Sequence, residues 1–202
     1  IAALDLPFFD RVLRDALAAD VQAGHIVRRV HRKEQHEREE IDGEPASLKT
    51  QVAIERPKSI LARNTSPDIP FDKSVNPYRG CEHGCIYCYA RPTNAYHDLS
   101  PGLDFESRLF AKPDAAKLLR AEIGRKGHVP SPIAFGTNTD AYQPIEREWR
   151  IMRQCLKVLA EANHPLTITT KSDRVLRDLD LLVPMAAKGL VAVAVSVTML
   201  DP

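Results

Sequence analysis

The residues with the clearest capacity for chemistry are three cysteines on one short segment. Cys81, Cys85 and Cys88 are separated by three and two residues, and they are three of the four cysteines in the chain. Gly80 and Gly84 allow the backbone of this segment to fold closely around a central object. Three thiolates on one loop are soft ligands, which favours a metal ion or an iron–sulfur cluster. A cluster with only three protein ligands leaves one iron open to a further ligand.

Zinc is the main alternative for these cysteines. A tetrahedral zinc site needs a fourth ligand, which His83 or His97 would supply, and the protein would then be a binding module without catalysis. Structural zinc sites usually pair two short knuckles, and the sequence has no second C-x2-C. A disulfide fits less well, because three clustered cysteines suit a reducing compartment. Cys155 lies in a helical pattern and is predicted to be a small core residue.

The composition of the whole chain bounds the class of protein. Its 202 residues include 28 Lys and Arg against 27 Asp and Glu, a balance that offers no electrostatic footprint for nucleic acid or membrane. No apolar run is long enough to span a bilayer, and no signal-peptide pattern is present, so we expect a cytoplasmic protein. The chain starts at Ile1 and stops at Pro202 shortly after a strand-like run. We therefore expect it to be part of a longer polypeptide.

The chain divides into an N-terminal extension, residues 1–60, and a main domain, residues 61–202. Within the extension, residues 5–23 have the apolar spacing of an amphipathic helix, and residues 28–40 form a run of mixed charge. Mixed-charge runs are usually solvated surface, so the histidines near this run are not predicted to bind metal.

Strand-like and helix-like segments alternate from residue 74 onward. The expected strands are 74–78, 132–136, 166–170 and 190–197, and the expected helices are 115–123, 149–162 and 175–187, with Pro184 breaking or bending the last. This order predicts a parallel α/β sheet with right-handed crossovers. The run over 190–197 is almost continuously apolar, which is typical of a strand buried on both faces.

Polar residues follow the last three of these strands. Ligands in parallel α/β folds gather at the carboxyl ends of the strands, so these residues are candidates for a binding site. They are Thr137, Asn138, Thr139 and Asp140 after the second strand, Thr170, Lys171, Ser172 and Asp173 after the third, and Ser196 and Thr198 after the fourth. Each also has a plainer interpretation: Asp140 would cap a turn, and Lys171 would be a surface charge.

The cysteine segment, read as C-x3-C-x-aromatic-C, resembles the radical S-adenosylmethionine (SAM) enzymes. The longer runs over residues 68–92 and 100–106 resemble a bacterial subfamily related to spore photoproduct lyase. The resemblance covers most of residues 60–202 and none of residues 1–50. It implies a partial barrel of six strand–helix units, of which four strands are visible and two would lie beyond the end of the chain.

The resemblance also implies cofactors and a reaction. Cys81, Cys85 and Cys88 would hold a [4Fe-4S] cluster whose fourth iron binds SAM. An electron from an external donor of the flavodoxin or ferredoxin type would cleave SAM to a 5′-deoxyadenosyl radical, which abstracts hydrogen from an unknown substrate. The relation to spore photoproduct lyase suggests a nucleic acid substrate, which the charge balance does not support.

Further residues are implied as contacts for SAM. Tyr87 stands where the family keeps an aromatic residue beside the adenine. The segment 136–140 would bind the amino group, with Thr137, Asn138 and Asp140 offering acceptors. Lys171 would reach the carboxylate of SAM or a substrate anion, and Ser196 would contact the ribose or the carboxylate.

Overall fold

The structure of this chain is a computed structural model that describes residues 49–197. These residues belong to a single unit spanning Leu48–Val197. The expected helix over 5–23, the charged run over 28–40 and Thr198 lie outside the described residues. Within them, no helix combines the length and the apolar character needed to cross a bilayer.

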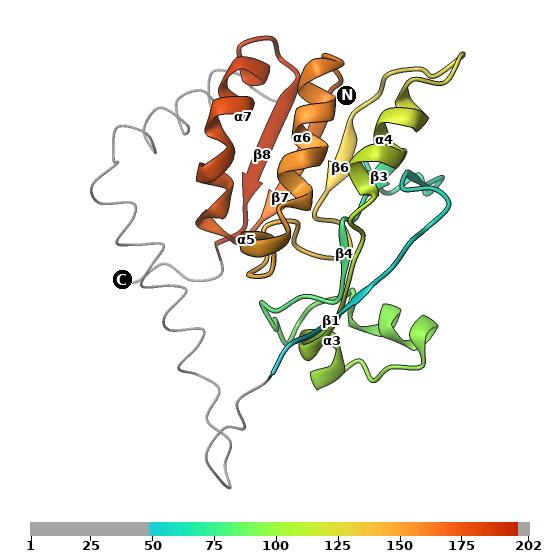
Figure 1. The fold of residues 1–202 in the computed structure, drawn as a ribbon, viewed down its shortest axis with the longest axis vertical. Helices are drawn as coiled ribbons and strands as arrows, with labels where there is room; N and C mark the ends of the chain where they lie inside the picture. The colour runs from blue at the N-terminus through green and yellow to red at the C-terminus, as the bar shows by residue number, and fades with distance from the viewer. Residues whose placement is uncertain (1–48, 198–202) are drawn as a thin grey trace, which may run out of the picture. The chain divides into compact units, whose positions relative to one another are not determined.

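A five-stranded sheet forms the centre of the fold, and four of its strands are parallel (Figure 1). The parallel strands are β3 (Lys73–Val75), β6 (Ile133–Phe135), β7 (Leu166–Thr170) and β8 (Val191–Val195), and the short strand β2 (Ala62–Arg63) pairs antiparallel with β3. The register aligns Val75, Phe135, Ile168 and Val193 across the sheet. The predicted parallel α/β sheet is therefore confirmed, and its carboxyl ends form one rim.

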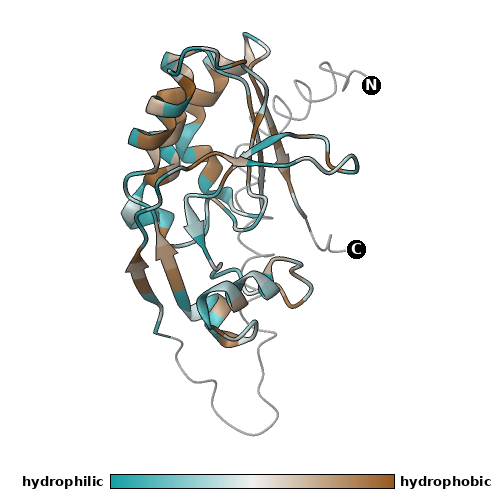
Figure 2. Cartoon of the chain, turned by 90° about the vertical axis from the view of Figure 1, so that its right-hand side faces the viewer, coloured by the Kyte–Doolittle hydropathy of each residue, from teal (hydrophilic) through white to brown (hydrophobic). Residues whose placement is uncertain are grey.

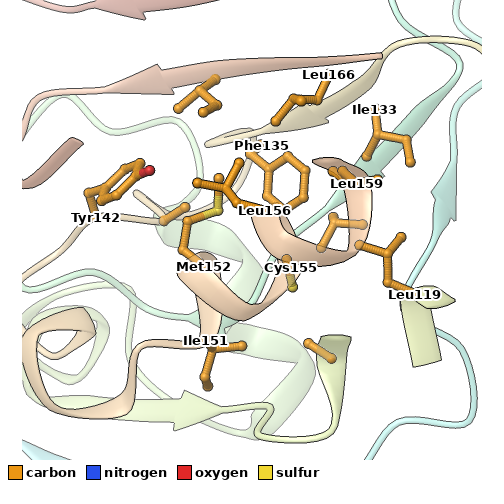
Figure 3. Packing of buried hydrophobic residues seen from close by; sticks show 14 of the residues in the cluster. Leu119, Ile133, Phe135, Tyr142, Ile151, Met152, Cys155, Leu156, Leu159 and Leu166 are labelled. Atoms are coloured by element: carbon orange, nitrogen blue, oxygen red, sulfur yellow. The ribbon is translucent and has the colours of Figure 1, made fainter. Parts of the chain in front are cut away.

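Three helices cover one face of this sheet (Figure 1). They are α4 (Ala115–Ile123), α6 (Ile151–Glu161) and α7 (Leu179–Ala186). The side of α6 that faces the sheet buries Met152, Cys155, Leu156 and Leu159 beside Phe135 (Figure 3). Hydrophobic residues, brown in Figure 2, run through these helices and the adjoining strands, whereas most connecting loops are hydrophilic. The prediction that Cys155 is a core residue is confirmed.

Two predicted helices are divided. The segment over 149–162 breaks at Arg150, which adopts a left-handed conformation with φ of 51°, so that α5 (Glu146–Trp149) is separate from α6. The buried carboxylate of Glu146 accepts the Met152 N–H at 3.0 Å, which caps the first turn of α6. The segment over 175–187 is the 3-10 helix η2 (Asp173–Asp178) followed by α7.

Of the break or bend expected at Pro184, the break is not found there. Pro184 lies inside α7, and the change of helix type occurs between Asp178 and Leu179. Asp178 is fully buried and accepts a hydrogen bond from the Arg153 guanidinium at 2.7 Å. This anchoring accounts for the position of the break better than the proline does.

A second, three-stranded sheet was not predicted. Its order is β1 (Gln51–Ile54), β5 (Arg108–Ala111) and β4 (Tyr78–Arg79), with β1 parallel and β4 antiparallel to β5. The strand expected over 74–78 is thus two strands in two sheets, divided at Asn76 and Pro77. Pro77 has no N–H to donate to a strand partner. The chain therefore leaves the main sheet after β3 and approaches the cysteines from the second sheet.

The last strand, β8, is only partly buried. Within the described residues it pairs with β7 alone, and Val195 is 54% exposed. The expectation that this apolar run is buried on both faces is wrong for its C-terminal end. An edge position explains the difference, because a neighbouring strand covers only one side of it.

Candidate metal and cofactor site

The cysteine loop connects β4 to the 3-10 helix η1 (Arg91–His97). Cys81 is 7% exposed, packs in a small cluster with Ala90 and Phe105, and donates its N–H to the Phe105 carbonyl at 2.8 Å. Gly80 precedes it with φ of +70°, and a Cβ there would lie 2.6 Å from Leu109 Cδ2 and 2.7 Å from the Phe105 oxygen. The loop can therefore start this deep only because residue 80 is glycine.

Arg91 holds the second half of the loop through its backbone. The guanidinium donates to the carbonyls of Gly84 and Cys85, each at 2.9 Å. It also donates to the carbonyl of Gly102 at 3.1 Å and pairs with Glu106 in helix α3 (Leu103–Ser107). The guanidinium is rigid and carries five N–H donors, so one arginine can bind several carbonyl groups at once. Sequence reasoning gave Arg91 no role, although it directly follows the segment that carries the cysteines.

The first half of the loop is tied to the segment that follows β6. The Glu82 N–H donates to Gln143 Oε1 at 3.0 Å, and the Glu82 carboxylate accepts the Ile145 N–H at 2.7 Å. The carbonyl of Gly80 accepts from the Thr139 hydroxyl at 2.6 Å and from Gln143 Nε2 at 3.2 Å. These contacts place the residues around Cys81 against the rim of the main sheet.

Asp140 lies at the centre of the same rim with a nearly buried side chain. Its Oδ1 accepts the Tyr142 N–H at 2.8 Å and the Thr170 hydroxyl at 2.7 Å. Its Oδ2 accepts the Lys171 N–H at 2.7 Å and lies 3.3 Å from His83 Nε2. Burial raises the pKa of Asp140, but His83 and the hydrogen-bond donors outweigh it, so the pKa lies below its ordinary value. Asp140 is therefore ionised at neutral pH.

The pKa of the Cys81 thiol shifts in the opposite direction to that of Asp140. Removal from water, with a smaller contribution from the negative charge of Asp140, raises the pKa of Cys81 to about 12. The thiol is protonated at neutral pH before a metal binds. Metal binding at Cys81 must therefore release a proton.

Three of the predicted cofactor contacts come together beside the loop. The Lys171 ammonium, after β7, lies 3.0 Å from the hydroxyl of Ser196, after β8. The same ammonium lies 5.3 Å from the ring centroid of Tyr87, within the range of a cation–π contact. Tyr87 is 63% exposed, so its ring is accessible from solvent. A cation, a hydroxyl and an aromatic face from three separate segments thus meet at one place.

The other predicted contacts lie at the neighbouring end of β6. The Asn76 side chain accepts from the Thr137 hydroxyl at 3.1 Å and from the Asn138 N–H at 3.0 Å, and the Asn138 side chain is exposed. The Tyr89 hydroxyl donates to the Thr137 carbonyl. Gly136 has φ of +84°, where a Cβ would fall 1.9 Å from a carbonyl oxygen of β7. Within the segment 137–140, Asn138 is therefore exposed, whereas the carboxylate of Asp140 is nearly buried.

Comparison with known proteins identifies the family. The Radical SAM superfamily matches residues 75–202. The chain belongs to the radical SAM superfamily. It is 42% identical over 134 residues to uncharacterized proteins of Mycobacterium tuberculosis and Mycobacterium bovis, a match that spans 66% of this chain and 39% of each relative. An uncharacterized protein of Methanocaldococcus jannaschii is 34% identical over 107 residues, which are 53% of this chain and 38% of that protein.

These relatives are much longer than the matched part, since the chain spans about two fifths of the length of the first curated relatives it matches. No solved structure matches the chain. Membership of the radical SAM superfamily supports SAM-dependent radical chemistry with an iron–sulfur cluster. Members of this superfamily are enzymes that typically use a [4Fe-4S] cluster, SAM and an external electron donor.

The donor set of this radical SAM chain fits such a cluster. Cys81, Cys85 and Cys88 lie on a single loop and form no disulfide, whereas Cys155 is fully buried in the core of the α6 layer. Across residues 49–197, no three His, Cys, Asp or Glu side chains are grouped for binding one metal ion. A cluster does not require such a group, because its thiolates bind different irons. His97, the other zinc candidate, stacks on a phenylalanine ring of β5 at 4.7 Å.

Proposed function

We propose that Cys81, Cys85 and Cys88 hold a [4Fe-4S] cluster and that SAM binds at the adjoining rim. When bound, the cluster and SAM supply a 5′-deoxyadenosyl radical that abstracts hydrogen from a substrate, with an external donor of the flavodoxin or ferredoxin type providing the electron. The observation that carries this proposal is the meeting of Lys171, Ser196 and Tyr87 beside the cysteine loop. SAM presents a carboxylate, a ribose and an adenine, and these three side chains match those groups.

The chemistry of each side chain supports a separate role. The Lys171 ammonium is a counter-ion for the SAM carboxylate, and the Ser196 hydroxyl beside it is a donor or acceptor for the carboxylate or the ribose. Tyr87 offers an exposed aromatic face to the adenine. The exposed amide of Asn138, with Thr137, offers acceptors to the SAM ammonium. Asp140 belongs to the same turn, but its oxygens already accept from protein donors.

The fold and the motif support finer proposals. The four parallel strands with helices on one face are consistent with the partial barrel of the superfamily. The run over residues 68–92 favours a branch related to spore photoproduct lyase. By that relation the substrate would be a nucleic acid, a class that the 28 basic and 27 acidic residues of the chain do not favour.

The test is turnover of SAM by the reconstituted chain. The protein is loaded with iron and sulfide without oxygen, reduced with dithionite and mixed with SAM, and 5′-deoxyadenosine and methionine are measured by chromatography. We expect a brown protein with about four irons per chain that releases both products. The matched control, Cys85→Ala, should release neither. A colourless parent protein that binds only zinc would contradict the proposal.

A further inference from the structure

One carboxylate connects three segments around the cysteine loop. Asp140 contacts His83 in the loop through Oδ2 at 3.3 Å, and the same oxygen accepts the Lys171 N–H at 2.7 Å. Its Oδ1 accepts from Tyr142 in its own turn and from Thr170 at the end of β7. The side chains of His83 and Asp140 are only 3% and 9% exposed. The contact is therefore shielded from water, where a polar contact to a carboxylate is stronger than at the surface.

The acceptor capacity of Asp140 is used within the protein. A carboxylate has about four lone-pair sites. Three of them accept hydrogen bonds from Tyr142, Thr170 and Lys171, and His83 Nε2 lies 3.3 Å from Oδ2. For the SAM ammonium to bind there, it would have to displace a donor that holds β7 or the loop. Asn138, two residues earlier and exposed, has no such conflict.

We infer that His83 and Asp140 form a clamp. This clamp positions the cysteine loop against the sheet rim and keeps it at a fixed position relative to Lys171. This inference rests on the proposed function only in that the loop carries the cluster. His83 stands between Cys81 and Cys85 in the chain, so an anchor at His83 restrains the backbone that carries both ligands. The same carboxylate also positions Lys171, because it accepts a hydrogen bond from the Lys171 backbone N–H. The clamp therefore links the position of two cluster ligands to that of the proposed SAM counter-ion.

A second anchor in the loop makes the expected effect graded. Glu82 binds the Ile145 N–H independently of His83. Loss of the clamp should loosen the residues around Cys85 while Glu82 still holds the chain near Cys81. His83 and Asp140 act through the cysteines and Lys171, so both are positioning residues.

The first experiment needs no cluster. Hydrogen exchange of the peptides covering residues 81–88 is followed by mass spectrometry in the full 202-residue chain. His83→Ala and Asp140→Asn should each speed exchange about tenfold, and His83→Gln, which keeps a nitrogen donor, should return it to within about twofold of the parent. Glu148→Gln, at an exposed acid on α5, is the matched control and should change nothing. Unchanged exchange in His83→Ala would overturn the inference.

The second experiment uses the reconstituted protein. Iron release to a chelator and the midpoint potential of the cluster are measured for the same variants. We expect His83→Ala to release iron about tenfold faster and to shift the potential, with His83→Gln restoring both. SAM affinity should fall in both His83→Ala and Asp140→Asn, and at least as far in Asp140→Asn, because that variant also changes the acceptor of the Lys171 N–H.

The outcomes separate this inference from the proposed function. If Asp140→Asn weakens SAM binding tenfold or more while His83→Ala leaves it unchanged, Asp140 acts on the SAM site without His83 and the clamp is wrong. If the parent protein assembles no cluster, the proposed function fails, and the exchange experiment still decides the clamp. If the parent assembles a cluster and His83→Ala matches it in exchange, iron release and potential, only the clamp fails.

Discussion

The two halves of the cysteine loop differ in how the protein holds them. Cys81 is buried, and the residues that follow it, Glu82 and His83, reach into the segment after β6. In the second half, Ile86 is 91% exposed and Tyr89 is 76% exposed, and Arg91 holds this half through carbonyl oxygens. The first half is fixed by the Glu82 and His83 side chains as well as by its backbone, whereas the second half is fixed mainly through the backbone carbonyls that Arg91 binds.

This difference suggests a division of labour. Side-chain anchors in the first half set the position of a ligand, and a half held by its carbonyls can present its side chains to a cofactor. Pre-organised ligand geometry generally depends on such supporting contacts. The predictions below test the contrast, from the largest effect to the smallest.

Removal of a ligand should have the same effect in either half. Cys81→Ala and Cys88→Ala should each abolish cluster assembly, because three thiolates are already the minimum for this type of cluster. Cys155→Ala removes a buried sulfur from the α6 core and should keep the iron content of the parent. Iron and sulfide analysis after reconstitution checks this. Loss of iron in Cys155→Ala equal to that in Cys81→Ala would show that the fourth cysteine is a ligand.

The start of the first half should tolerate no side chain. Gly80→Ala combines a left-handed backbone with contacts of 2.6 and 2.7 Å, and it should lower the free energy of unfolding by about 3 kcal/mol or more. Gly127→Ala has a similar φ of +85° but nothing within 4 Å of the new Cβ, so it should cost only about 1 kcal/mol. Urea denaturation measures both. Equal losses would mean that backbone conformation alone explains Gly80.

The anchor at Glu82 should matter less than Gly80 but more than any exposed residue. Glu82→Ala removes the acceptor for the Ile145 N–H and for the Thr50 hydroxyl. We expect a loss of about 2 kcal/mol in the free energy of unfolding, because a buried N–H is left without its charged acceptor. The matched control is again Glu148→Gln. A change of Glu82→Ala no larger than that of the control would remove the distinction between the two halves.

The exposed second half should give the smallest effect on stability. Tyr87→Ala should change the free energy of unfolding by about 0.5 kcal/mol or less, because the ring is largely in solvent. The same variant should weaken SAM binding about tenfold through loss of the aromatic face. Equilibrium dialysis with labelled SAM measures the affinity. If Tyr87→Ala lost stability but bound SAM normally, Tyr87 would be a structural anchor, and the second half of the loop would not be the part that presents side chains to the cofactor.

The sequence was sufficient for the four parallel strands of the main sheet but not for its antiparallel strand β2 or for the second sheet. β7 and the helix α4 were predictable because apolar and β-branched residues recur at regular spacing within one segment. β1, β4 and β5 pair over long sequence separations and are two to four residues long, so no periodicity marks them. The chain passes from one sheet to the other at Asn76 and Pro77, which were predicted to lie inside a single strand.

The candidate site was predictable to a similar extent. Spacing alone pointed to the three cysteines, and the ends of β7 and β8 pointed to Lys171 and Ser196, which the structure brings together. The contacts of Arg91 and Asp140 were not predictable. The sequence alone does not distinguish an arginine or aspartate that is exposed to solvent from one that binds several distant parts of the chain.

The most direct test of the account is electron spin resonance of the reduced, reconstituted chain with and without SAM. The account predicts one cluster signal per chain whose line shape changes when SAM is added, and no signal in Cys85→Ala. A strong cluster signal that SAM leaves unchanged would contradict the claim that the rim beside the cysteine loop binds SAM at the open iron.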